Sequence, residues 1–174
     1  MAMGSVRVIE SRRIYSGGIK LRKDRFLLGD RVIDKEIVEH QDSVGIVAVN
    51  GRDVILVAQY RRAAGKVLLE IPAGKIEKGE KPRQAAIREM AEEIGYSGKL
   101  ELLMKWYLAP GYSTELMHVF VATNLRKITR GPLDDDENIM IRKVKLSMAL
   151  RKCLSGEIQD SKTVAALLGY SQSD

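Results

Sequence analysis

A helix-forming stretch between Pro82 and Gly95 is the feature that most constrains how this chain folds. Proline is tolerated in the first turn of a helix, and glycine readily adopts the left-handed conformation that ends one. Four apolar side chains recur between them at helical spacing, namely Ile87, Met90, Ala91 and Ile94. The stretch therefore predicts an amphipathic helix that ends at Gly95.

Segments typical of β-strands lie on both sides of this helix. Three of them, separated by turn signals, predict an N-terminal antiparallel meander: residues 6–15, 19–28 and 31–38. Two apolar runs around the hairpin signal Asn50-Gly51 predict more buried strands: residues 44–49 and 54–60. Later strands are expected at residues 99–107, 116–122 and 139–144, and later helices at 146–154 and 163–168. This order of elements indicates a mixed α/β fold.

Length and composition fit a folded protein without a membrane segment. The chain has 174 residues, of which 45% are hydrophobic and 30% charged. Its longest apolar run, residues 46–49, is far shorter than the roughly 20 residues of a membrane-spanning helix, and no signal-peptide core is present. A single cysteine, Cys153, cannot form an internal disulfide. We therefore expect a cytoplasmic protein.

The basic charge balance admits more than one kind of ligand. A formal net charge of +6 and a pI near 9.4 suit nucleic acid as well as small polyanions. The basic residues between Lys20 and Arg25 alternate with Leu21 and Asp24, as on an ordinary strand. A dedicated nucleic-acid surface is therefore the less favoured interpretation.

Three glutamates converge on one side of the expected helix. At 100° per residue, Glu89, Glu92 and Glu93 lie together, opposite the apolar positions. Like charges three and four residues apart repel each other by a few tenths of a kcal/mol per pair, unless a cation neutralises them. Taken alone, the three residues admit a divalent cation site or a solvated acidic face.

The sequence around these glutamates has a highly specific spacing. Its fixed positions are Gly74, Glu80, Arg88, Glu89, Glu92, Glu93 and Gly95. At about 6% for each residue type, the positions match by chance with a probability on the order of 10⁻⁹. The segment resembles the box of the Nudix family, with Tyr96 where an aliphatic residue is usual. The resemblance implies the Nudix α/β/α sandwich, with a mixed central sheet and an added N-terminal antiparallel sheet.

The same resemblance implies a metal-dependent site that binds Mg²⁺ or Mn²⁺. Hard cations held by oxygen ligands neutralise the charge that develops when a phosphoanhydride is hydrolysed. Glu89, Glu93 and the Ala73 carbonyl are the implied metal ligands. Glu92 is implied as a further ligand or as a group that orients the water, so Glu92 and Glu93 are catalytic candidates. The usual task of the box arginine, Arg88, is to brace the glutamates.

Residues 59–62, 70–74 and 109–115 resemble the ADP-ribose pyrophosphatase branch of the family, and so do residues 156–163. Pro110 matches the proline of that branch, although Ala109 stands where serine is more frequent. The substrate-binding candidates are Arg61, Glu70, Pro110 and Glu115. A guanidinium such as that of Arg61 suits a diphosphate, although an arginine after a strand is otherwise more often a solvated edge residue. Glu70 is a candidate for holding a ribose or adenine donor.

An acidic run at residues 134–137 lies before an expected strand. On its own it indicates a solvated loop. Members of the branch often use an acid from this loop to deprotonate or orient the water, and Glu137 best matches that position. Asp135 and Asp136 are the alternatives for this catalytic role.

These resemblances imply Mg²⁺-dependent hydrolysis of the pyrophosphate bond of ADP-ribose, or of a related nucleoside diphosphate sugar, to AMP and ribose 5-phosphate. Because N-terminal strands commonly pair across a homodimer in this branch, we expect residues 1–40 to be a dimerisation extension and residues 41–174 to be the hydrolase domain. Two alternatives stay open. One is a dinucleoside polyphosphate or nucleotide-sanitising hydrolase, and the other is a non-catalytic module that binds a nucleotide or RNA.

Overall fold

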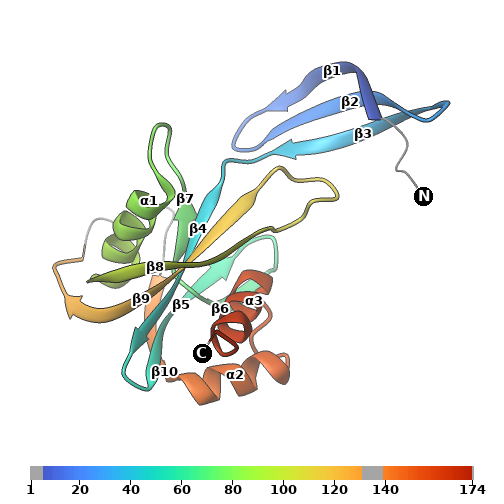
Figure 1. Ribbon diagram of the computed structural model, residues 1–174. Helices are drawn as coiled ribbons and strands as arrows, with labels where there is room; N and C mark the ends of the chain where they lie inside the picture. Colours follow the sequence, from blue (N-terminus) through green and yellow to red (C-terminus); the bar gives the residue numbers. More distant parts are fainter. Residues whose placement is uncertain (1–5, 131–138, 174) are drawn as a thin grey trace. The chain divides into compact units, whose positions relative to one another are not determined.

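The computed structural model describes residues 6–130 and 139–173 (Figure 1). The chain divides into two compact units, which are described separately. Unit 1 comprises Met1–Asp42 and Tyr107–Leu116, and unit 2 comprises Ser43–Trp106 and Met117–Asp174.

Unit 1 contains the predicted N-terminal meander. Its antiparallel sheet has the order β1-β2-β3, with the strands β1 (Val6–Ser16), β2 (Lys20–Leu28) and β3 (Arg31–Glu39). The segment Tyr107–Leu116 binds the end of β3. Val38 N donates to the Tyr112 carbonyl at 2.7 Å, and Thr114 N donates to the Val38 carbonyl at 3.1 Å. Val38 and Ser113 therefore form an isolated parallel bridge, which joins residues 107–116 to the sheet of this unit.

Unit 2 is built on a mixed sheet of seven strands. Its main path runs β10-β5-β4-β9-β8, while β6 pairs with β5 and β7 pairs with β4. The strands are β4 (Ser43–Asn50), β5 (Asp53–Arg61), β6 (Lys66–Glu70), β7 (Ala73–Lys75), β8 (Tyr96–Tyr107), β9 (Leu116–Lys127) and β10 (Ile139–Lys145). β4 runs parallel to β9 and antiparallel to β5 and β7. The Asn50-Gly51 hairpin joins β4 to β5 as predicted, and Gly51 has a φ of 64°.

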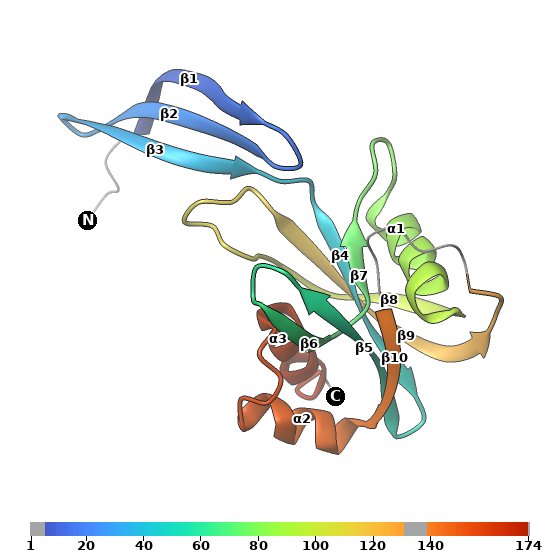
Figure 2. The same ribbon diagram turned by 180° about the vertical axis from the view of Figure 1, so that it is seen from behind.

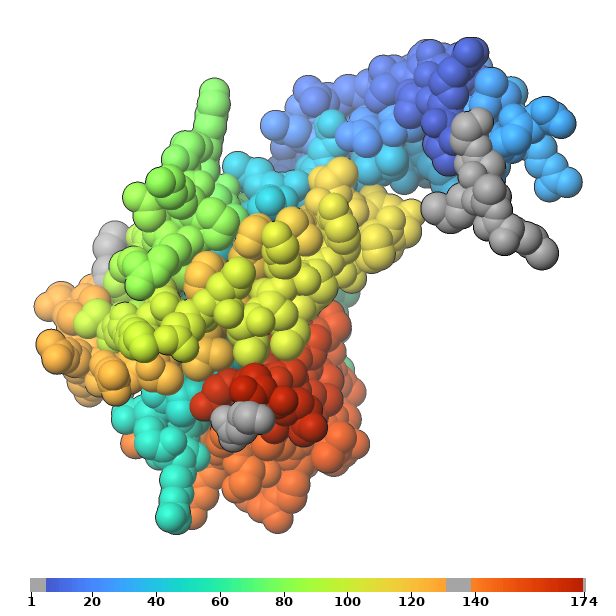
Figure 3. All heavy atoms as spheres, viewed as in Figure 1, coloured from blue at the N-terminus to red at the C-terminus, as the bar shows by residue number. Residues whose placement is uncertain are grey.

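Helices cover both faces of this sheet (Figures 1 and 2). α1 (Pro82–Glu89) continues into the π-helix η1 (Met90–Ile94) on one face, while α2 (Leu146–Leu154) and α3 (Ser161–Tyr170) lie side by side on the other (Figure 3). The core under α1 joins Ile46 and Val57 of the sheet to Ala86, Met90 and Ile94. The predicted α/β/α sandwich with a mixed sheet is confirmed. None of the described helices is long and apolar enough to cross a membrane.

The buried face of the central helix differs from the predicted one. Ile87 was expected in the core, but 45% of its surface is exposed, so this prediction was wrong. The buried positions repeat every four residues instead: Ala85 and Ala86, Glu89 and Met90, Glu93 and Ile94. A π-helix closes its hydrogen bonds over one more residue than an α-helix, which rotates the later side chains away from the spacing of 3.6. The helix still ends at Gly95, whose φ of 68° is left-handed as predicted.

Two short strands, β6 and β7, were not predicted. β6 forms a hairpin with β5, in which Arg61 lies opposite Lys66. β7 has only three residues and pairs with the start of β4, where Gly74 lies opposite Val44. Such a short segment contains too few residues to show a strand periodicity.

The helix register predicts unequal effects of two truncations on stability. Met90→Ala empties a fully buried site and should lower the free energy of unfolding by about 2 to 5 kcal/mol. Ile87→Ala removes a half-exposed side chain of the same helix and should cost about 1 kcal/mol or less. Urea unfolding of both variants measures the difference, and equal losses would contradict the observed register.

Candidate functional site

The two buried glutamates of the central helix face the short strand β7. The Ala73 amide donates to Glu93 Oε2 at 2.9 Å, and Glu93 is only 2% exposed. The Glu89 carboxylate lies directly against Gly74, since a Cβ at this position would come within 1.9 Å of Glu89 Oε1. A glycine is therefore required at position 74 for this close approach. The structure thus brings together three residues predicted as metal ligands, Ala73, Glu89 and Glu93.

Arg88 holds the acidic residues of this region in place. Its guanidinium donates to both carboxylate oxygens of Glu80 at 3.1 and 3.0 Å, to Glu89 Oε1 at 2.8 Å and to Glu92 Oε2 at 3.1 Å. A fifth bond joins it to the Lys75 carbonyl at 3.0 Å. The hydrogen bond to Glu80 is the largest cause that raises the pKa of Arg88, and it lowers the pKa of Glu80 in turn. Arg88 thus has the contacts of the brace that the resemblance implied.

The donor chemistry of this region fits a hard divalent cation. Carboxylate and carbonyl oxygens are the ligands that Mg²⁺ and Mn²⁺ prefer. Because Gly74 has no Cβ, the Glu89 carboxylate can lie directly against the backbone of this turn. Within the described residues, no group of three or more His, Cys, Asp or Glu side chains is arranged to hold a metal ion. The metal-binding roles of Ala73, Glu89, Glu92 and Glu93 therefore stay predictions, as do the catalytic roles of Glu92 and Glu93.

Arg61, the last residue of β5, and Glu70, the last residue of β6, form a two-pronged ion pair. Arg61 Nε and Nη2 donate to Glu70 Oε1 and Oε2, both at 2.7 Å. The Glu70 side chain is 1% exposed, whereas that of Arg61 is 40% exposed. Burial raises the pKa of Glu70, but hydrogen bonds and charge from Arg61 and Lys162 outweigh it, so the pKa lies below the ordinary value. Substrate binding by either residue stays a prediction, and Arg61 is the one that faces solvent.

Sequence reasoning missed the side chains that surround Glu70 from α3. Lys162 Nζ forms an ion pair with Glu70 Oε2 and another with Asp160 Oδ1 at 2.8 Å. From the sequence alone, the segment 156–163 shows only a resemblance to the branch. One signal was present, because a lysine in the first turn of a helix opposes the helix dipole and calls for an acidic partner.

Arg130 was also missed. Its Nε donates to the carbonyl of Glu92 at 2.9 Å. The last carbonyl groups of a helix lack intrahelical partners and carry partial negative charge, so an arginine there stabilises the helix end. Arg130 therefore supports the end of the helix that carries Glu89, Glu92 and Glu93.

The remaining predicted residues fall outside unit 2 or outside the described residues. Pro110 and Glu115 belong to unit 1, where His40 Nδ1 lies 3.4 Å from Glu115 Oε2. Their participation in substrate binding stays a prediction. Glu137 and its alternatives, Asp135 and Asp136, lie outside the described residues.

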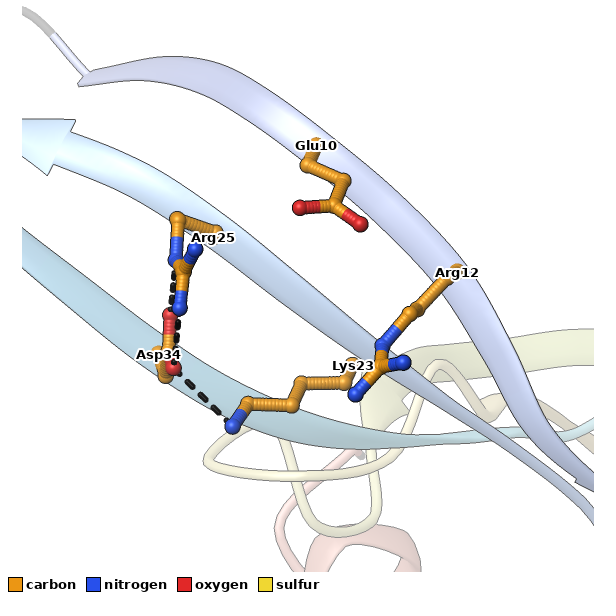
Figure 4. A pocket seen from close by; sticks show the side chains of 5 residues that line it. All are labelled: Glu10, Arg12, Lys23, Arg25 and Asp34. Carbon is orange, nitrogen blue, oxygen red and sulfur yellow. Dashed lines mark hydrogen bonds and ion pairs between the residues drawn. The ribbon is translucent and has the colours of Figure 1, made fainter.

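A separate charged cavity of about 250 Å³ lies on the sheet of unit 1 (Figure 4). Its lining residues are Glu10, Arg12, Lys23, Arg25 and Asp34. Arg25 Nε and Lys23 Nζ both lie 2.9 Å from Asp34, and the hydrogen bond from Arg25 is the largest cause that lowers the Asp34 pKa. The lining mixes both signs of charge and includes none of the predicted site residues, so this cavity is not the candidate catalytic site.

Comparison with known proteins identifies relatives over nearly the whole chain. The NUDIX domain family matches residues 39–167. A methanol dehydrogenase activator of Bacillus methanolicus is 39% identical over 92% of this chain and 90% of its own length. An ADP-ribose pyrophosphatase of Bacillus subtilis is 36% identical over the same shares. A GDP-mannose pyrophosphatase of Escherichia coli is 32% identical over 79% of this chain and 77% of its own.

The fold has a match among solved structures as well. The crystal structure of an ADP compounds hydrolase superposes with a TM-score of 0.87, covering 99% of this chain and 95% of that chain. At 21% identity this likeness concerns the fold alone. The sequence relatives carry the assignment further and confirm the predicted class of enzyme, a Nudix pyrophosphohydrolase. The chain belongs to the Nudix hydrolase family, in the branch that includes the ADP-ribose pyrophosphatases.

Proposed function

We propose that this enzyme hydrolyses the pyrophosphate bond of ADP-ribose, or of a closely related nucleoside diphosphate sugar, to AMP and ribose 5-phosphate with Mg²⁺ or Mn²⁺. The observation that carries the proposal is the approach of two buried carboxylates, Glu89 and Glu93, to the Ala73-Gly74 turn. Relatives named ADP-ribose pyrophosphatase, at 36% and 34% identity, support ADP-ribose as the substrate.

In this proposal Glu89, Glu93 and the Ala73 carbonyl hold the cation, and Glu92 is either a further ligand or a group that orients the water. A bound divalent cation would neutralise charge on the pyrophosphate and lower the pKa of a bound water. The Glu92 side chain is 32% exposed, which leaves it accessible to a ligand. Glu137 is proposed as the further acid that deprotonates or orients the water.

Arg61 is proposed to bind the substrate diphosphate. Its hydrogen bonds to Glu70 use Nε and Nη2, so Nη1 and a second N–H of Nη2 are directed elsewhere. The buried Glu70 carboxylate fixes the plane of the guanidinium, and a fixed guanidinium binds phosphate oxygens with less loss of side-chain entropy. Glu70 is proposed to serve the ribose or adenine end of the ligand, and Pro110 and Glu115 are proposed as further substrate-binding residues.

The proposed assembly is a homodimer formed through residues 1–40. Every described residue of β1 is exposed, and no strand pairs with its outer edge in the described part of unit 1. Val6 and Leu28 are register partners on one face of this sheet, with exposed fractions of 62% and 44%, and Val8 beside them is 57% exposed. An open edge beside exposed apolar side chains is typical of a strand that pairs with a second chain. A cytoplasmic location stays a prediction.

The proposed activity predicts a clear order within a substrate panel. Phosphate release after a coupled phosphatase should be fastest with ADP-ribose, slower with other ADP-sugars, dinucleotides and dinucleoside polyphosphates, and slowest with nucleoside triphosphates. EDTA should abolish it, because the metal supplies the main charge neutralisation. Glu89→Gln should lower kcat by more than about 100-fold, since even changes beside metal ligands cost 10- to 100-fold.

Other rank orders would identify the alternatives. Fastest turnover of nucleoside triphosphates would favour a nucleotide-sanitising hydrolase. Fastest turnover of dinucleoside polyphosphates would favour a dinucleoside polyphosphate hydrolase. Salt-sensitive retention of RNA without any turnover would favour a binding module. Full activity of Glu89→Gln would overturn the assignment of the metal ligands.

Gly74→Ala should impair catalysis more than folding. The added Cβ would meet the Glu89 carboxylate, which must move and would then be misplaced as a metal ligand. We expect the Mg²⁺ concentration for half-maximal activity to rise at least about 10-fold. Gly18→Ala is the matched control, because its Cβ would meet nothing within 4 Å. Equal metal titrations for the two variants would contradict the proposed role of the turn.

The proposed dimer predicts a molar mass of about twice 19.4 kDa in light scattering after size exclusion. Val8→Glu should shift the protein toward the monomer, because a charge would enter the proposed interface. Lys99→Glu, at an exposed ion pair in unit 2, is a control that should leave the mass unchanged. A monomeric wild-type protein would refute this assembly.

A further inference from the structure

Lys162 reaches a buried carboxylate of the candidate site from another element of the fold. It lies in the first turn of α3, and its ammonium group pairs with Glu70 and Asp160. The three side chains are 11%, 1% and 13% exposed, respectively. A lysine loses part of its hydration in such a place and opposes the helix dipole, so its two acidic partners account for its position.

Charged side chains of alternating sign form a row from the start of α3 to the partly exposed guanidinium of Arg61. Asp160, Lys162, Glu70 and Arg61 follow one another with opposite signs, so the row is neutral in sum. Lys162 binds Glu70 Oε2, the same oxygen that accepts from Arg61 Nη2. A two-pronged pair fixes both partners in one plane. The placement of Glu70 by Lys162 therefore sets the direction in which the free side of Arg61 points.

The next residue of α3 fixes the backbone beside Glu70. Ile71 N donates to Thr163 Oγ1 at 2.8 Å, and that hydroxyl donates to Asp160 Oδ2 at 2.5 Å. Two residues after Ile71, the Ala73 amide donates to Glu93 at 2.9 Å. The segment 70–73 is thus held by α3 at one end and by the glutamate helix at the other.

We propose that the first turn of α3 is a positioning element of the catalytic site, in which Lys162 orients Glu70 and thereby directs Arg61 toward the substrate diphosphate. Thr163 fixes the position of Glu70 relative to Glu93, because it holds the backbone of the segment 70–73. The inference rests on the proposed function, because it requires Arg61 to bind the diphosphate. Lys162 does not touch the reacting atoms, so it is a positioning residue.

A double-mutant cycle between Lys162 and Arg61 tests the inference. In the full-length enzyme with ADP-ribose and Mg²⁺, Lys162→Met should lower kcat/KM by about 10- to 100-fold, mainly by raising KM. In an Arg61→Ala background the same substitution should change kcat/KM by less than about 2-fold, because the residue through which it acts is gone. The Mg²⁺ concentration for half-maximal activity should stay the same, since Glu89 and Glu93 are intact.

Two further variants separate positioning from general stabilisation. Lys162→Arg keeps the cation and should bring kcat/KM closer to the wild-type value than to that of Lys162→Met. Lys152→Met removes an ion pair between exposed side chains, Lys152 and Glu157, and should leave kcat/KM unchanged. If circular dichroism shows that Lys162→Met is unfolded, Lys162→Gln takes its place in the cycle with the same criterion.

Each outcome bears on a different claim. The positioning role would be overturned if the Lys162 and Arg61 substitutions lowered kcat/KM independently, so that their effects multiplied in the double variant. A shift of the Mg²⁺ titration in Lys162→Met would overturn it as well. Either result would leave the proposed function in place. Absence of any nucleotide-sugar turnover by the wild-type enzyme would overturn the proposed function and this inference with it.

Discussion

The hydrogen bond from the Ala73 amide to Glu93 is the contact on which the arrangement of the site depends. Glu93 is buried, and a buried carboxylate without a donor would cost several kcal/mol. The bond therefore holds the three-residue strand β7 to the helix. Gly74 then allows Glu89 to reach the same turn. A strand too short to be stable alone is held in place by the acids of the site.

Two charge clusters of different balance flank this contact. Around Arg88, one guanidinium serves the carboxylates of Glu80, Glu89 and Glu92, so the cluster carries a net charge of −2, from +1 and −3. The row from Asp160 to Arg61 sums to zero. An excess of negative charge suits a bound cation, whereas a neutral row suits the fixing of one guanidinium. Because the residues of the row from Asp160 to Arg61 are far apart in the sequence, the different net charges of the two clusters cannot be predicted from the sequence alone.

The parts of the fold that follow from local patterns could be predicted. The Asn50-Gly51 hairpin, the N-terminal meander and the helix end at Gly95 each depend on residues close in sequence. The spacing from Gly74 to Gly95 led to the family, because few arrangements of residues share it. β7 and the row through Lys162 could not be predicted, since their partners come from distant parts of the chain and a pattern within one segment does not contain them. Ile87 was misplaced because the 3.6-residue period was extended through a π-helix.

The four-residue repeat of the central helix couples the positions of its buried acids to the packing of the core. Each buried pair beyond Ala85-Ala86 joins one acid to one core side chain, Glu89 to Met90 and Glu93 to Ile94. Any rotation that moved the acids would also pull the neighbouring apolar side chains out of the packed interior. Repacking mutations under this helix should therefore also displace Glu89 and Glu93. The packing of the hydrophobic core and the positions of Glu89 and Glu93 are therefore set together along this helix.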